Sequence, residues 1–172
     1  MNQKVLRFFA SGAFISYLPT AILKNKKNTG AGLLGSVEAF LIYLFLGPLT
    51  FWAYLFLLLG IILFAIYVSQ KTEFNGVEDD PKIIIDEIAG FFTAAAFLPY
   101  SLKTAIFALI LFRIFDTTKI FFIKKAENFA VNIPQKTYNK YCLKGVQIVL
   151  DDVLAGLFSN LILWILIYFK FL

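Results

Sequence analysis

The chain has 172 residues, of which 60% are hydrophobic and 18% aromatic, with a mean hydropathy of +0.78 and a formal net charge of +5. These values exceed the apolar share of a soluble globular domain and predict an all-α integral membrane protein, a single domain over 1–172. The sequence has no histidine and one cysteine, which excludes Ser-His-Asp triads, phosphohistidine intermediates, histidine-bound metals and intrachain disulfides.

The first apolar segment, about residues 5–23, follows Lys4 and Arg7 and contains Pro19. It imitates a signal peptide, but no small-x-small cleavage site follows, so we expect a short interfacial or re-entrant helix of the mature protein. Further apolar segments, bounded by charge, glycine or proline, cover about residues 30–46, 49–69, 83–102, 104–123 and 145–169. Since crossing the bilayer takes about 20 residues, we expect about five transmembrane helices.

Lysines are distributed unevenly between the connecting loops. The loops at 24–28, 71–82 and 119–144 are lysine-rich, whereas the turn at 47–50 carries no charge and the turn at 99–103 has a single lysine. Cytoplasmic loops of membrane proteins collect Lys and Arg. The asymmetry therefore predicts that the basic loops face the cytoplasm and that the C-terminus lies outside.

Several charged residues lie within the apolar segments, where this orientation gives each a depth, since a helix rises about 1.5 Å per residue. All of them fall in the cytoplasm-facing half of their segments. They are the acidic pairs Asp86 with Glu87 and Asp151 with Asp152, together with Arg113, Asp116 and, one turn nearer the surface, Lys119. Glu38 lies in the same half of its own segment, 30–46. We therefore predict that these groups meet at one level of the membrane.

Charges within membrane helices usually mark a functional path or site. The negative charges of five carboxylates cannot share one cavity without compensation; the five are Asp86, Glu87, Asp116, Asp151 and Asp152. Mg²⁺, which prefers oxygen ligands, would offset this charge. Arg113 and Lys119 add donors suited to phosphate oxygens, so the pattern predicts phosphoryl transfer or hydrolysis. Two alternatives stay open: Arg113 and Asp116 form a purely structural i,i+3 pair, or the protein is a cation or proton-coupled transporter, which the bare outer halves of the segments disfavour. The acidic tract at 78–80 is expected to be a solvated loop.

Gly30, Gly32 and Gly35 in the stretch TGAGLLGS spell GxGxxG. No strand precedes them and no βαβ unit surrounds them, so a dinucleotide site is not expected. Their amide groups at a helix N-terminus would hold phosphate, or the glycines serve tight helix packing. Gly90 and Gly156 each follow an acid at i+4 and predict close helix approach on the acidic face.

Four stretches, in order AGLLGS, IIIDEIAGFF, FRIFDTTK and VLDDVLAG, resemble the phosphatidylglycerophosphatase A family over nearly the whole chain after residue 30. The resemblance implies a Mg²⁺-dependent membrane phosphatase of phospholipid metabolism, which hydrolyses phosphatidylglycerophosphate to phosphatidylglycerol and phosphate. It also implies a multi-pass protein of the bacterial inner membrane whose active site faces the cytoplasm. The expected partners are the phospholipid substrate and the bilayer, with no nucleotide and no nucleic acid.

The resemblance also assigns roles to individual residues. The implied catalytic residues are Asp86, Glu87, Asp116, Asp151 and Asp152, of which Asp86, Glu87, Asp151 and Asp152 are the implied metal ligands. The implied phosphate-binding residues are Arg113, Lys119, Gly32, Gly35 and Ser36. The family's usual Pro-Gly-Thr before its Gly-Ser is replaced here by residues 31–33, which affects loop shape and substrate fit. Attack by water and attack by an aspartate nucleophile both remain open.

Overall fold

A computed structural model describes residues 2–22, 30–72, 80, 82–118 and 143–172. In these ranges every regular element is an α-helix, which confirms the predicted all-α class. The helices are α1 (Gln3–Ala10), α2 (Tyr17–Ile22), α3 (Ala31–Leu46), α4 (Phe51–Lys71), α5 (Ile85–Ala94), α6 (Leu102–Thr118) and α9 (Leu143–Tyr168).

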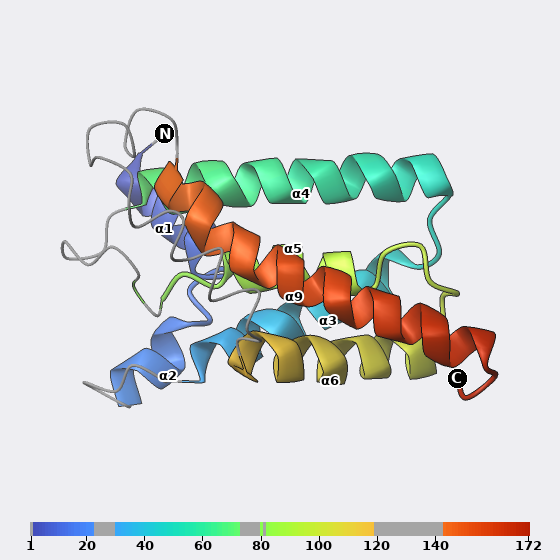
Figure 1. The fold of residues 1–172 in the computed structure, drawn as a ribbon. Coiled ribbons are helices and arrows are strands. Elements are labelled where there is room, and N and C mark those ends of the chain that lie inside the picture. Colours follow the sequence, from blue (N-terminus) through green and yellow to red (C-terminus); the bar gives the residue numbers. More distant parts are fainter. Residues whose placement is uncertain (1, 23–29, 73–79, 81, 119–142) are drawn as a thin grey trace.

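Four long helices, α3, α4, α6 and α9, run along the length of the molecule, and α5 lies among them (Figure 1). The short helix α5 packs most extensively against α9 and also contacts α3, α4 and α6. The first turns of α3, α5 and α9 and the last turns of α4 and α6 lie at one end of the molecule (Figure 1). We call this the acidic end, because Asp86, Glu87 and Asp152 lie there.

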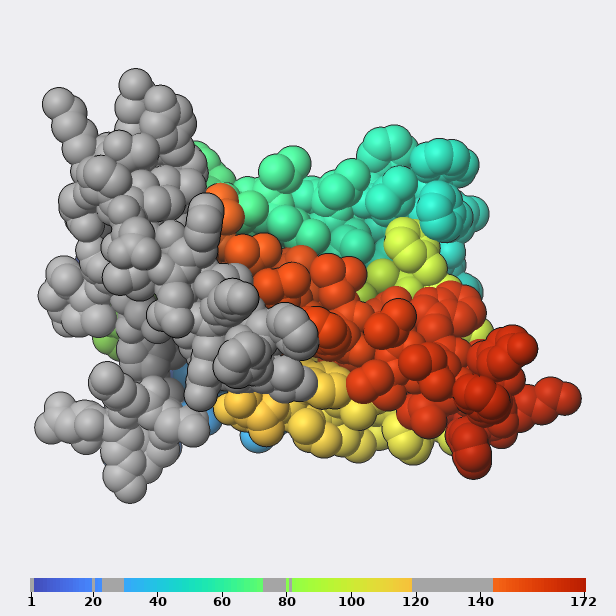
Figure 2. All heavy atoms as spheres, in the orientation of Figure 1, coloured from blue at the N-terminus to red at the C-terminus, as the bar shows by residue number. Residues whose placement is uncertain are grey.

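Two of the helices, at Phe51–Lys71 and Lys144–Tyr168, are long and apolar enough to cross a membrane, with mean hydropathies of 2.5 and 1.8. Only 22% and 33% of their most apolar windows are buried, whereas a core helix of a soluble protein is mostly buried. Figure 2 shows α4 and α9 exposing side chains on the same face. Exposed apolar surface of this extent suits lipid contact. The expected number of about five spanning helices is not confirmed.

The predicted spanning segment at 83–102 contains only the ten-residue helix α5. Ten residues rise about 15 Å, half the thickness of a hydrocarbon core. The chain leaves the helix after Ala94, and residues 95–101 are not helical, with Phe97 at a positive φ of 58°. All residues from 89 to 96 are buried. The prediction of one continuous helix up to a turn at 99–103 was therefore wrong.

The N-terminal segment is also divided, because α1 and α2 are separated by a turn at residues 11–16. Gly12, Ala13 and Phe14 have φ values of 53°, 51° and 70°, which no continuous right-handed helix allows. Pro19 does not break the segment, since it lies within the first turn of α2, where its missing N–H is tolerated. The prediction of a single helix over 5–23 was wrong.

The end of α1 and the turn at 11–16 pack against the non-helical residues that precede α5. The Ile84 amide donates to the Ala10 carbonyl at 2.8 Å, and the Ser16 hydroxyl donates to the Lys82 carbonyl at 2.8 Å. Asp80, expected in a solvated loop, is only 6% exposed and accepts a hydrogen bond from the Lys82 amide at 2.9 Å. These contacts fix the backbone that leads into the acidic first turn of α5.

Candidate active site

Three carboxylates from two helices form a cluster at the acidic end. Asp86 and Glu87 lie in the first turn of α5, and Asp152 lies in the third turn of α9. One oxygen from each carboxylate lies within 4.8 Å of the other two. Residues far apart in the sequence thus converge at one end of the helix bundle.

Two glycines bring α5 and α9 close enough for this convergence. A Cβ atom on Gly156 would collide with the Gly90 carbonyl oxygen, and a Cβ atom on Gly90 would lie 2.8 Å from the Asp152 carbonyl oxygen. Real Cβ atoms essentially never approach so closely. The i+4 glycines therefore allow the close helix contact that the sequence predicted.

Arg113 is the cationic group that the described part of the chain contributes to the site. Its Nη1 atom lies 2.7 Å from an oxygen of Asp116, one turn further along α6, and donates to the Ser36 hydroxyl at 3.2 Å. Ser36 in turn donates to the Gly32 carbonyl at 2.8 Å. The side chains of Arg113 and Asp116 are each 19% exposed, and the guanidinium carries further N–H groups beyond Nη1. Arg113 therefore ties α6 to α3 and keeps donors for a ligand.

Gly32 borders both the acidic cluster and the guanidinium. A Cβ atom there would collide with Oε1 of Glu87 and would lie 3.2 Å from Nη1 of Arg113. A Cβ atom on Gly35 would lie 2.8 Å from the Cβ atom of Ile84. At Gly32 and Gly35 the geometry favours the packing interpretation, whereas Gly30 caps α3 with a φ of 77° and has nothing near its open side.

Asp116 extends the cluster, because its side chain lies close to that of Asp152, as Asp86 lies close to Glu87. Carboxyl groups so close need a proton or a cation between them. Asp151, the neighbour of Asp152, is half-buried and is not a member of the three-carboxylate group. Lys119 lies outside the described residues.

The cluster fits a hard divalent cation. Its donors are all carboxylate oxygens, the ligand type that Mg²⁺ prefers. Oε2 of Glu87 is buried and has no hydrogen-bond partner among the described residues, so an acceptor there is left for a ligand. Among the described residues, the carboxylates of Asp86, Glu87, Asp116 and Asp152 also outnumber the guanidinium of Arg113, which forms an ion pair with Asp116. A cation would offset this excess of negative charge.

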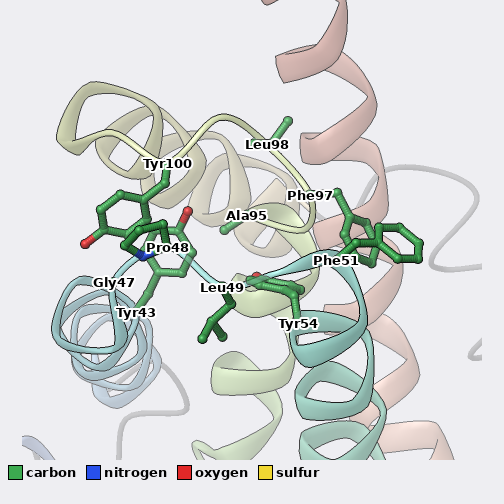
Figure 3. Close-up of a pocket in the computed structure, with 10 residues that line it drawn as sticks. All are labelled: Tyr43, Gly47, Pro48, Leu49, Phe51, Tyr54, Ala95, Phe97, Leu98 and Tyr100. Atoms are coloured by element: carbon green, nitrogen blue, oxygen red, sulfur yellow. The ribbon is translucent and has the colours of Figure 1, made fainter.

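A cavity of about 260 Å³ lies at the opposite end of the molecule, which we call the aromatic end (Figure 3). None of the described residues that line it is charged; they are Tyr43, Gly47, Pro48, Leu49, Phe51, Tyr54, Ala95, Phe97, Leu98 and Tyr100. Tyr54, which drew no functional prediction, donates its hydroxyl to the Phe92 carbonyl of α5 at 2.7 Å. A buried tyrosine usually finds a hydrogen-bond partner. The position of this tyrosine within an otherwise apolar helix is therefore the sequence feature that could have predicted the contact.

Comparison with known proteins identifies relatives among phospholipid phosphatases. The sequence profile of a family described as phosphatidylglycerophosphatase A matches residues 8–167. A Bacteroides thetaiotaomicron protein, provisionally named a phosphatidylinositol-3-phosphatase, is 31% identical over 143 residues, or 79% of this chain and 80% of that protein. A Haemophilus influenzae phosphatidylglycerophosphatase A is 31% identical over 104 residues, or 59% of this chain and 56% of its own length. No solved structure matches. Because the profile spans nearly the whole chain, the protein belongs to the phosphatidylglycerophosphatase A family.

Proposed function

We propose that the protein removes the terminal phosphate of phosphatidylglycerophosphate, giving phosphatidylglycerol and inorganic phosphate, in a Mg²⁺-dependent reaction. The observation that carries the proposal is the cluster of Asp86, Glu87 and Asp152 beside Arg113, in a member of this family. Buried oxygen ligands next to a guanidinium suit a cation and a phosphate monoester together.

Asp86, Glu87 and Asp152 are the residues that would hold Mg²⁺. Mg²⁺ is commonly held by one or two carboxylates plus substrate phosphate, so three converging carboxylates are sufficient. When bound, the cation supplies Lewis-acid polarisation of the phosphoryl group. The sequence resemblance adds Asp151 as a ligand, whereas the described geometry supports the other three.

Arg113 would bind the phosphate oxygens, and its neighbours would orient it. The Asp116 carboxylate and the Ser36 hydroxyl both contact Nη1, which leaves the remaining guanidinium donors for the substrate. Charge-assisted bonds of this kind are among the stronger hydrogen bonds and favour the planar guanidinium over a lysine ammonium.

Two routes for the chemical step are compatible with these residues. In the first route, a carboxylate of the site accepts a proton from a water that attacks the phosphorus and displaces phosphatidylglycerol. In the second, an aspartate attacks the phosphorus, displaces phosphatidylglycerol and forms an aspartyl phosphate, which water then hydrolyses to release inorganic phosphate. Acid quenching of a reaction with ³²P-labelled substrate separates them, because only the second route leaves label on the denatured protein.

We place the protein in a bacterial cytoplasmic membrane as a multi-pass protein, with the acidic end facing the cytoplasm. The outward apolar surfaces of α4 and α9 and the lysine-rich loops support this placement. Fusing alkaline phosphatase or green fluorescent protein to the C-terminus tests it. We expect the alkaline phosphatase fusion to be active. If only the green fluorescent protein fusion gave a signal, the C-terminus would lie in the cytoplasm and the proposed orientation would be wrong.

Phosphatidylinositol 3-phosphate is a second candidate substrate, because the Bacteroides thetaiotaomicron relative that aligns with 79% of this chain carries that activity in its name. The transporter alternative is disfavoured by the family match and by the uncharged character of the described residues that line the cavity at the aromatic end.

Phosphate release by detergent-purified protein tests the substrate. The panel contains phosphatidylglycerophosphate, phosphatidylinositol 3-phosphate, phosphatidate and, as a soluble control, glycerol 3-phosphate. We expect phosphatidylglycerophosphate to give the highest kcat/KM. A higher value for phosphatidylinositol 3-phosphate would favour the second candidate, and release from none of the lipids would reject both.

A further inference from the structure

The helix α5 ends in the middle of the bundle, which creates a problem for its backbone. The last four carbonyl groups of any helix have no partner within that helix. Ala94, Ala95 and Ala96, where α5 ends, are at most 6% exposed. In such surroundings each unpaired carbonyl is costly, so other parts of the protein must supply the donors.

The described structure supplies a donor to every carbonyl from residue 91 to residue 96. The local amides of residues 95, 96 and 98 donate to the carbonyls of residues 91, 93 and 95. The remaining three carbonyls, of residues 92, 94 and 96, accept hydrogen bonds from neighbouring helices. The Tyr54 hydroxyl of α4 donates to the Phe92 carbonyl at 2.7 Å, and the Asn160 side-chain amide of α9 donates to the Ala94 and Ala96 carbonyls at 3.0 and 2.8 Å.

We propose that Tyr54 and Asn160 are positioning residues for the acidic cluster, because they fix the depth at which α5 sits against α4 and α9. The proposal rests on the proposed role of Asp86, Glu87 and Asp152 as the cation site. Tyr54 and Asn160 touch neither the substrate nor the cation; they act through the rigid helix α5.

The register of α5 against α9 carries this inference. The two helices start at the same end and match in three layers, each four residues apart. The first layer pairs Asp86 with Asp152 in the cluster, the second stacks Gly90 on Gly156, and the third bonds Ala94 to Asn160. Because a helix rises about 1.5 Å per residue, the third layer is about 12 Å from the acids. A slip of α5 at that layer moves the carboxylates of Asp86 and Glu87 relative to Asp152.

The experiment compares two isosteric variants at the same end of the molecule. Tyr54→Phe removes the bond to α5. The matched control, Tyr100→Phe, removes a hydroxyl that donates to the Leu44 carbonyl of α3 at 2.9 Å and has no bond to α5. Asn160→Leu, which removes both donors of Asn160, is the stronger third variant. The readouts are Mn²⁺ affinity of the detergent-purified protein by electron paramagnetic resonance, which needs no substrate, and the thermal melting point.

We expect Asn160→Leu to weaken Mn²⁺ binding by about tenfold, the lower end of the effect seen when groups behind metal ligands are removed. Tyr54→Phe should weaken it by about threefold, and Tyr100→Phe should leave it unchanged even if all three melt earlier. Wild-type Mn²⁺ affinity in folded Tyr54→Phe, or an equal loss in Tyr100→Phe, overturns the positioning role. Wild-type protein that releases phosphate but binds no Mn²⁺ also overturns it, while protein that binds Mn²⁺ and releases no phosphate counts against the proposed function alone.

Discussion

Replacing Gly32 with alanine isolates the closest contact in the site. The added methyl would collide with Oε1 of Glu87 and lie 3.2 Å from Nη1 of Arg113, whereas ordinary contacts are 3.4–4 Å. The Glu87 carboxylate must therefore withdraw by about 1 Å, and a misplacement of about that size costs about a hundredfold in rate. A hundredfold loss equals about 2.7 kcal/mol of transition-state stabilisation.

The matched control is Gly60→Ala in α4, where an added Cβ atom meets nothing within 4 Å. Helix propensity alone predicts that alanine stabilises either helix by about 0.5–1 kcal/mol. Gly60→Ala should therefore melt at or above the wild-type temperature and keep its activity, whereas in Gly32→Ala the displacement of Glu87 offsets the gain in helix propensity and activity is lost. The assay is phosphate release from phosphatidylglycerophosphate in detergent micelles. Activity of Gly32→Ala within twofold of wild type would refute the placement of Glu87 against α3.

Three other changes test separate parts of the site. Gly90→Ala places a methyl 2.8 Å from the Asp152 carbonyl oxygen, so overpacking should lower the free energy of unfolding by about 1–3 kcal/mol. Thermal melting against Gly60→Ala measures this loss, and an unchanged melting point would contradict the close α5–α9 contact. Arg113→Lys keeps the charge but loses the guanidinium that contacts Asp116 and Ser36 and that we propose binds the phosphate. We therefore expect kcat/KM to fall by about ten- to a hundredfold, and a wild-type value would remove Arg113 from phosphate binding. Asp152→Asn should weaken Mn²⁺ binding more than Asp151→Asn, since only Asp152 belongs to the three-carboxylate group; the reverse order would mean that the cation sits elsewhere.

The all-helical fold and the boundaries of α3, α4 and α9 followed closely from hydropathy, because each is one apolar run bounded by charge or glycine. The end of α5 did not follow from hydropathy. Residues 93–97 read as good helix, yet the helix ends at Ala94, where Asn160 and Tyr54 supply donors to its last carbonyls from distant parts of the chain. Hydropathy measures how well a segment suits lipid and carries no information on such partners.

The candidate site was more predictable than the fold around it. Depth alone grouped Asp86 and Glu87 with Asp152, because buried charges in separate helices have to meet. The distinction between Asp151 and Asp152 was out of reach, since adjacent residues on a helix differ by a rotation of about 100° whose direction depends on packing. The link from Arg113 to Ser36 likewise required the relative placement of α3 and α6.

Phosphate release from phosphatidylglycerophosphate as a function of free Mg²⁺ tests the central claim most directly. Detergent-purified protein is stripped with a chelator, assayed, and assayed again as Mg²⁺ is restored, with wild type and Asp152→Asn in parallel. We predict that chelation abolishes release, that Mg²⁺ restores it in wild type, and that Asp152→Asn needs more Mg²⁺ or stays inactive. Release that is indifferent to the chelator, or an Asp152→Asn response identical to wild type, would contradict a cation site built from Asp86, Glu87 and Asp152.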